Sequence, residues 1–370
     1  MNHGQRLRHN TYILMRFFSQ ILQLPIYSID ISDLSYKYLA LRQNKSGIVV
    51  SDFGEGDIPA GIIENGEIKQ AESLSSLLRS IFAKRNIRFI AISLPDEKGF
   101  LKSIKIPSNV LEDELDATIG LALEEHIPLP TAEAAFDYVV VGKDNANYDI
   151  VLRAFPRIII DGYLSALSSA GAKPVLAEPE LSAMVRAVVR SDEPASAMLI
   201  DWGKTRTSFA IFDHATVRFA ATAPLGGNAI TDAIMKELKV GKEEAEQIKR
   251  AKDRLSVDIR SASAGGLLGS VIPILSAMSS EAERYMRFWN SHAEGNKPIT
   301  RVYLVGGDVN INGLPEYLAK KLGVDVVFGN PWRNVMFPSK YLPEIFFKDS
   351  LRFTSALGLS LKALEESQIL

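Results

Sequence analysis

Two aspartates, each at the end of a predicted strand, are the residues in this chain that first suggest chemistry. Within residues 197–213, Asp201 follows a short apolar run and precedes a polar turn that leads into a second apolar run. This pattern predicts a β-hairpin with Gly203, Lys204 and Thr205 at its tip. Backbone N–H groups and hydroxyls at such a turn can hold a phosphate, and the carboxylate can hold its Mg²⁺. A polar turn without a ligand is the alternative interpretation.

A second hairpin of the same design is predicted near the N-terminus. Asp30 ends a strand that begins at residue 26, a Ser/Asp turn starts at Ser32, and Lys37 lies on the returning strand. Two such hairpins indicate an internal duplication with one nucleotide site between the halves. Mg²⁺ sheds its hydration shell reluctantly, so Asp30 and Asp201 are expected to hold it mainly through water.

A third element fits the same plan. Residues 301–305 form a predicted buried strand, which is followed by Gly306, Gly307 and Asp308, and a helix is predicted from about residue 313. A glycine pair after a strand lets the backbone approach a flat ring or a sugar closely. We therefore expect the ring or sugar of a ligand at this turn.

The order of these three elements resembles the phosphate-one, phosphate-two and adenosine motifs of the actin, heat-shock chaperone and sugar kinase superfamily. Within that superfamily, the sequence is most similar to the PilM and FtsA family, whose members are actin-like proteins of type IV pilus assembly and of cell division. Residues 225–231, 245–249 and 354–361 carry further likeness. The resemblance covers about residues 26–364.

The resemblance implies an α/β fold of the actin-like, ribonuclease H-like type, with two lobes and a small α+β insert in the first lobe. It also implies ATP and Mg²⁺ as cofactors, with Asp30 and Asp201 at the metal. Glu246 and Lys249 would reach the ribose and adenine, although a solvated helix face is the alternative for these two. The implied nucleotide-binding residues are Asp30, Ser32, Lys37, Asp201, Gly203, Lys204, Thr205, Gly227, Glu246, Lys249, Gly306, Gly307 and Asp308.

The sequence departs from the family pattern in each motif. Ser32 stands where the first turn usually has a glycine, and Trp202 and Lys204 replace small residues in the second turn. Asp308 would disfavour a nearby phosphate, and Lys204 would offset part of this as a phosphate ligand. No general base is identifiable, because acids at a helix start, such as Glu180, commonly serve the helix dipole alone. Any ATP hydrolysis is therefore expected to be slow.

The resemblance implies a scaffold of type IV pilus assembly, or of a related type II secretion system, whose nucleotide state tunes partner binding. It would be cytoplasmic and peripheral at the inner membrane. A groove beside the insert would hold the cytoplasmic N-terminal tail of a PilN-like inner-membrane protein. Other pilus-assembly proteins, self-association and peripheral membrane contact are further expected interactions.

Two alternatives to this function remain open. The first is a nucleotide-free adaptor with a vestigial site, which the missing glycine of the first turn favours. The second is an actin-like ATPase or a sugar kinase, for which no sugar-binding acid is found. FtsA-like membrane targeting is not expected, because no amphipathic helix follows Leu364.

Composition excludes several other classes of function. A chain of 370 residues with 46% hydrophobic residues can bury the cores of two lobes. A net charge of −2 gives no electrostatic basis for nucleic-acid binding. The absence of cysteine excludes disulfides and thiolate metal sites and fits a reducing cytoplasm, and the five histidines show no metal-ligand spacing. No apolar run is long enough for a transmembrane helix.

The expected domain organisation follows the change in pattern along the chain. The short apolar stretch of the N-terminal tail is read as an amphipathic helix that touches a membrane or a partner, as a disordered tail, or as the result of a start codon placed upstream of Met15. Helices are predicted within the insert over 110–125 and 156–170, and later over 242–254 and 267–292. The expected boundaries are 1–25 for the tail; 26–98 with 173–195 and 351–364 for the first lobe; 99–172 for the insert; and 196–350 for the second lobe, with a helical subdomain at 241–295.

Overall fold

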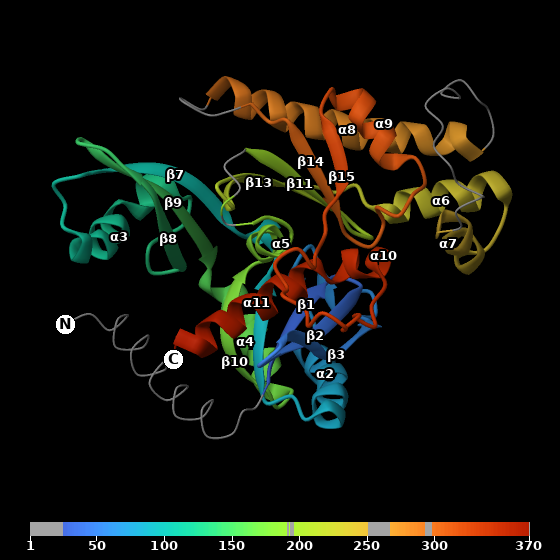
Figure 1. The fold of residues 1–370 in the computed structure, drawn as a ribbon, viewed down its shortest axis with the longest axis horizontal. Coiled ribbons are helices and arrows are strands. Elements are labelled where there is room, and N and C mark those ends of the chain that lie inside the picture. Colours follow the sequence, from blue (N-terminus) through green and yellow to red (C-terminus); the bar gives the residue numbers. More distant parts are fainter. Residues whose placement is uncertain (1–24, 191, 193–195, 251–266, 293–297, 370) are drawn as a thin grey trace.

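Two five-stranded sheets of the same design form the framework of the molecule (Figure 1). The computed structural model describes residues 25–190, 192, 196–250, 267–292 and 298–369. The sheet of the first lobe has the order β10-β6-β1-β2-β3, and the sheet of the second lobe has the order β15-β14-β11-β12-β13. Each consists of three consecutive antiparallel strands and two strands parallel to the first of them. This repeated topology matches the internal duplication predicted from the two hairpins.

The first strand of each sheet is buried along most of its length, without an alternation of buried and exposed residues. The first-lobe strands are β1 (Ile26–Ser32), β2 (Ser35–Asn44), β3 (Gly47–Asp57), β6 (Phe89–Leu94) and β10 (Lys173–Pro179). The second-lobe strands are β11 (Ala197–Trp202), β12 (Thr207–Asp213), β13 (Thr216–Ala223), β14 (Arg301–Val305) and β15 (Asp325–Phe328). Asp30 and Asp201 both occupy the fifth position of the first strand, β1 and β11 respectively.

Helices cover the outer face of the first-lobe sheet. The helix α2 (Ala71–Arg85) follows the small hairpin of β4 (Ile63–Glu64) and β5 (Glu67–Ile68), which has an Asn-Gly turn. Beside α2 lies α4 (Arg157–Ser169), and Tyr163 and Leu167 of α4 share one buried cluster with Leu78 of α2 and Ile29 of β1. The sequence placed α4 in the insert. Its apolar face instead packs on the first-lobe sheet, because that is the surface that buries it.

The insert therefore consists of one helix on a small sheet of its own. Its strands are β7 (Phe100–Pro107), β9 (Asn147–Pro156) and β8 (Ala134–Lys143), in the order β7-β9-β8. The helix α3 (Leu115–His126) packs Ile119 and Leu123 against Ile150 and Leu152 of β9. Residues 112–114 form a 3₁₀ turn, so α3 begins five residues later than predicted. In Figure 1 this unit projects from one side of the molecule.

The second lobe carries its helices on the face of the sheet that lies away from the first lobe. Their bounds are α6 (Gly227–Leu238), α7 (Lys242–Arg250), α8 (Leu267–His292) and α9 (Leu314–Leu322). Pro273 lies inside α8, as predicted. Trp202, Phe209 and Leu275 lie in the core beneath these helices. The predicted N-terminal helix and the end of the helix predicted to residue 254 fall outside the described residues.

Two helices pack together at the junction of the lobes. They are α5 (Glu180–Val188) and α11 (Thr354–Ile369), and α11 follows the short α10 (Phe347–Ser350) and a 3₁₀ turn (Leu351–Phe353). Val188 of α5 and Leu357 of α11 belong to one cluster with residues of both sheets. A Cβ at Gly358 would lie 1.8 Å from the carbonyl oxygen of Ala183, so α11 approaches α5 at a contact that only glycine permits. None of the helices in the described ranges is both long and apolar enough to span a lipid bilayer.

Candidate nucleotide-binding site

A cleft of about 420 Å³ lies between the two lobes, within the size range of small-molecule sites. It is lined by the ends of β1 and β11, by the turns that follow them, and by the residues after β14. Three segments that are far apart in the sequence therefore meet at one place. Ten of the thirteen predicted residues line this cleft: Asp30, Ser32, Lys37, Asp201, Gly203, Lys204, Thr205, Gly306, Gly307 and Asp308.

The first hairpin supplies a carboxylate that is held in place from two sides. Asp30 is buried, and its Oδ1 accepts a hydrogen bond of 2.8 Å from Ser93 Oγ on the neighbouring strand β6. Lys37 lies directly opposite Asp30 in the β1–β2 ladder, and its Nζ is 3.6 Å from Asp30 Oδ2. The strand register thus orients Asp30 into the cleft with a cation beside it.

The second carboxylate of the cleft has perturbed proton affinity. Burial, and after it the negative charge of Asp30, raise the pKa of Asp201 to about 7. Two carboxylates that destabilise each other's charge fit a divalent cation with its phosphate ligands. The described residues contain no group of three or more His, Cys, Asp or Glu side chains arranged for a metal ion. The donor set therefore fits Mg²⁺ that keeps most of its water and phosphate ligands.

The tip of the second hairpin is fixed by the start of α6. Gly203 N–H donates to the carbonyl oxygen of Arg206, which closes the turn. Gly227 N–H donates to Gly203 O at 2.9 Å, and Asn228 N–H donates to Lys204 O at 2.8 Å. A Cβ at Gly226 would lie 2.4 Å from Lys204 O. The glycine pair that starts α6 therefore supports the hairpin tip from behind, and Gly227 does not line the cleft.

The glycine pair after β14 lies in the cleft, and its first member approaches the end of β11 closely. Gly306 has a φ of +104°, and a Cβ there would lie 2.5 Å from both Asp201 Oδ1 and the carbonyl oxygen of Trp202. Gly307 faces the Arg352 side chain instead, and a Cβ at Gly307 would lie 3.7 Å from Arg352 Cβ, an ordinary contact. Of these two positions, only 306 thus requires glycine for its backbone conformation.

Lys249 and Glu246 lie behind the cleft wall, where they hold Asp308. Lys249 is buried, and its Nζ lies 2.7 Å from Asp308 Oδ1 and 2.8 Å from Glu246 Oε1. The same ammonium donates to Thr231 Oγ1 at 2.9 Å and to Gly227 O at 3.2 Å. The interpretation of Lys249 as part of a solvated helix face is therefore wrong. Its positive charge also neutralises Asp308, the acid that the sequence suggested would repel phosphate.

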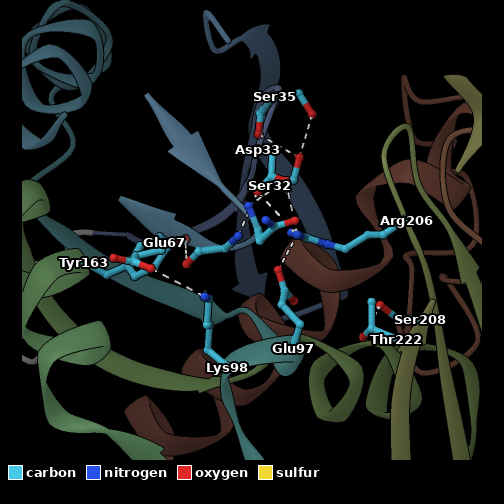
Figure 2. A network of polar contacts seen from close by, with 12 residues as sticks. Ser32, Asp33, Ser35, Glu67, Glu97, Lys98, Tyr163, Arg206, Ser208 and Thr222 are labelled. Carbon is cyan, nitrogen blue, oxygen red and sulfur yellow. Dashed lines mark hydrogen bonds and ion pairs between the residues drawn. The ribbon is translucent and has the colours of Figure 1, made fainter. Parts of the chain in front are cut away.

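Sequence reasoning missed the residue that links the lobes across the cleft, Arg206. Its side chain lines the cleft, lies 3.3 Å from Asp33 Oδ1, and forms a further ion pair with Glu97 (Figure 2). Both acids belong to the first lobe, whereas Arg206 ends the turn of the second hairpin. A single arginine beside the small residues of a predicted phosphate turn was the available signal.

Two further ion pairs and one buried acid involve residues that line the cleft. Lys204 Nζ is 3.3 Å from Asp57, and Arg352 is 3.2 Å from Glu55. In the first of these pairs the acid again belongs to the first lobe and the base to the second hairpin. Glu180, at the start of α5, lines the cleft as well, and burial raises its pKa well above the usual range.

A second cavity, of about 240 Å³, lies beside the insert. Phe100 and Leu101 of β7 form one side, and Ala220 to Thr222 of β13 form the other. Both β7 and β13 are edge strands of their sheets. We call this cavity the insert groove; it is lined by Asp96, Glu97, Gly99, Phe100, Leu101, Arg153, Phe155, Pro179, Ala220, Ala221 and Thr222.

A family model described as type IV pilus assembly protein PilM matches residues 28–364 of this sequence. The chain belongs to the PilM family. This membership confirms the resemblance inferred from the order of the three motifs, and it assigns the chain to type IV pilus assembly.

Solved structures with the same fold include a chain of the "PilM-PilN type IV pilus biogenesis complex", with a TM-score of 0.76 and 21% identity over 92% of this chain and 99% of that one. Ethanolamine utilization protein EutJ from Carboxydothermus hydrogenoformans matches with a TM-score of 0.54 and 14% identity, over 95% and 99% of the two chains. MreB5 of Spiroplasma citri bound to ADP matches with a TM-score of 0.54 and 13% identity, over 93% and 98%. These likenesses confirm the predicted two-lobed, actin-like α/β fold.

Proposed function

We propose that this protein is an ATP-binding scaffold of type IV pilus assembly that holds the cytoplasmic N-terminal tail of a PilN-like inner-membrane protein. The observation that carries the proposal is the convergence of both Asp-tipped hairpins and the Gly306-Gly307 turn on one cleft. Membership of the PilM family supports the assembly role, and the solved PilM-PilN complex supports the partner. MreB5, which shares the fold, was solved with ADP, and this supports a nucleotide in the cleft.

Different residues of the cleft would bind the phosphates, the Mg²⁺ and the adenosine of the nucleotide. Lys37, Lys204 and Arg206 would bind the phosphates, together with backbone N–H groups of the two hairpins. Asp30 and Asp201 would hold hydrated Mg²⁺, which supplies charge neutralisation to the phosphates when bound. The adenosine would pack on the backbone of Gly306 and Gly307, where Arg250 and Arg352 also line the cleft.

The geometry supports slow hydrolysis at most. Glu180 is the acid at the start of α5 that lines the cleft, whereas Glu178 is bound to Arg186 and Lys362 outside it. Burial raises the pKa of Glu180, so the ionised form that could accept a proton from water is disfavoured at this position. We therefore propose that nucleotide occupancy, more than turnover, is what the scaffold uses.

We propose that the tail of the partner binds in the insert groove. An extended peptide can add to the free edge of a sheet by main-chain hydrogen bonds, and this groove has a free edge on each side, β7 and β13. Such binding would hold the protein at the inner membrane through its partner, in the cytoplasm.

Calorimetric titration with ATP, with and without Mg²⁺, tests the nucleotide site. We expect saturable binding that depends on Mg²⁺ and is lost in Asp201→Asn. Asp213→Asn is the matched control, because Asp213 ends the other strand of the same hairpin and does not line the cleft. Absence of binding at millimolar ATP in the wild type would refute the proposal and leave an adaptor with a vestigial site.

A further inference from the structure

The nucleotide cleft and the insert groove share one wall. Arg206 lines the cleft, Glu97 lines the groove, and the two side chains form an ion pair. Figure 2 shows Arg206 reaching from the second lobe to Glu97 and Asp33 of the first. Arg206 therefore contacts an acid of the groove while it faces the place proposed for the phosphates.

The two acidic partners of Arg206, Asp33 and Glu97, differ in the other polar contacts that they make. Asp33 accepts hydrogen bonds from the backbone N–H groups of Asn65, at 3.2 Å, and Gly66, at 2.9 Å. The Glu97 oxygens are buried, and neither accepts a hydrogen bond from another residue in the described part of the chain. Burial raises the pKa of Glu97, and the positive charge of Arg206 lowers it. An unpaired buried carboxylate is costly, so without Arg206 the Glu97 carboxylate must gain a positive charge from another source or take up a proton.

The groove is where a replacement charge would enter. Its own cation, Arg153, already interacts with Glu178, Asp96 and Asp137, which stabilise its positive charge. Glu97 receives the larger part of its counter-charge from the cleft side, through Arg206, and a smaller part from Lys98. A cationic group on a segment bound in the groove would be attracted to Glu97.

We infer that Arg206 couples the two sites by exchanging partners, an inference that rests on the proposed binding of ATP in the cleft and of a peptide in the groove. Phosphates that bind Arg206 draw its charge away from Glu97, and a cationic group in the groove then restores that charge. Each ligand therefore raises the affinity for the other, by the same factor in both directions. The groove ligand is an extended segment with a lysine, an arginine or a free N-terminal ammonium near Glu97.

The test is a set of calorimetric titrations of the full chain with Mg²⁺ and ATP, in the absence and presence of a saturating synthetic peptide. The peptide has the first twelve residues of the PilN-like protein from the same organism. In the wild type we expect the peptide to raise the affinity for ATP about fivefold or more. In Glu97→Gln, which needs no counter-charge, the peptide should bind more weakly, so it is added at a concentration that saturates this variant. The ratio of the two ATP affinities should then fall to about one.

Asp57→Asn is the matched control, because it removes the other ion pair to the second hairpin, that of Lys204, and does not touch the groove. The ratio of the ATP affinities with and without the peptide should be the same in this variant as in the wild type. Arg206→Lys gives a second test, since a single ammonium cannot contact both Asp33 and Glu97 as the guanidinium does, and its ratio should also fall.

The outcomes separate the coupling from the function on which it rests. If both ligands bind but the peptide leaves ATP affinity unchanged or lowers it, the coupling is refuted and the proposed function stands. A ratio in Glu97→Gln equal to that of the wild type also refutes it. If either ligand fails to bind the wild type alone, the proposed function and the coupling are both overturned.

Discussion

Lys249 Nζ lies 2.7 Å from Asp308 Oδ1, and both side chains are almost completely buried, Asp308 in the lining of the cleft and Lys249 behind it. A buried ion pair is costly to break from one side, because the remaining charge has no water to solvate it. Glu246 shares Lys249, but Asp308 has no second cationic partner among the described residues. This pair therefore fixes the position of the residue that follows the glycine pair.

Replacing Lys249 should destabilise the second lobe. We expect Lys249→Met to lower the free energy of unfolding by about 3 kcal/mol or more, since it leaves Asp308 buried without its counter-charge. Urea unfolding followed by circular dichroism measures the change. The control is Lys236→Met, an exposed lysine of α6, which should change stability by less than about 0.5 kcal/mol. Equal effects of the two variants would contradict a role for the buried pair.

The two glycines after β14 should respond differently to the same substitution. Gly306→Ala forces a residue with a side chain to a φ of +104° and places its Cβ against Asp201 and Trp202. We expect a loss of about 2 kcal/mol or more in thermal unfolding experiments. Gly307→Ala meets only ordinary contact with Arg352, so its melting temperature should stay close to that of the wild type. A similar loss in both would mean that neither position depends on close approach.

A matched pair of helical glycines tests the packing of α11 on α5. At Gly358 a Cβ would overlap the backbone of Ala183, so Gly358→Ala should push the two helices apart and lower the melting temperature by several degrees. At Gly162, in α4, a Cβ would point into open space, with no neighbouring atom within 4 Å. There the same change should raise stability by about 0.5–1 kcal/mol, because alanine loses less backbone entropy in a helix. Stabilisation at Gly358 would refute the close contact.

Stability should depend on pH through Asp201. Its pKa of about 7 in the folded protein lies above the usual aspartate value, so the folded state binds this proton more tightly than the unfolded state does. The contribution of the protonated carboxyl is complete below about pH 4 and is lost as the pH rises through about 7. Asp201→Asn cannot ionise, so it should gain stability relative to the wild type by up to about 1.4 kcal/mol per pH unit between pH 5 and 7.

Urea unfolding of both proteins across that range, without nucleotide and Mg²⁺, measures this difference. The same series with Asp213→Asn is the control, because Asp213 lies outside the cleft. A stability difference between Asp201→Asn and the wild type that stays constant from pH 5 to 7 would show that Asp201 ionises normally.

Sequence alone determined the features that depend on local pattern. Asp30 and Asp201 could be placed at strand ends because apolar runs and polar turns are short-range signals. The glycine pair at Gly306 was recognisable because glycine after a strand has few other uses. The order of these elements then indicated the family, the two-lobed fold and most of the cleft.

Tertiary structure decided the features that depend on contacts between distant segments. A charged residue on a predicted helix, Lys249, reads as solvated until the fold buries it against Asp308. Likewise, Arg206 reads as a turn residue until the lobes bring Glu97 to it, and α4 reads as part of the insert until its apolar face meets the first-lobe sheet. Burial and charge pairing are set by which surfaces meet, and a local pattern carries no information about that.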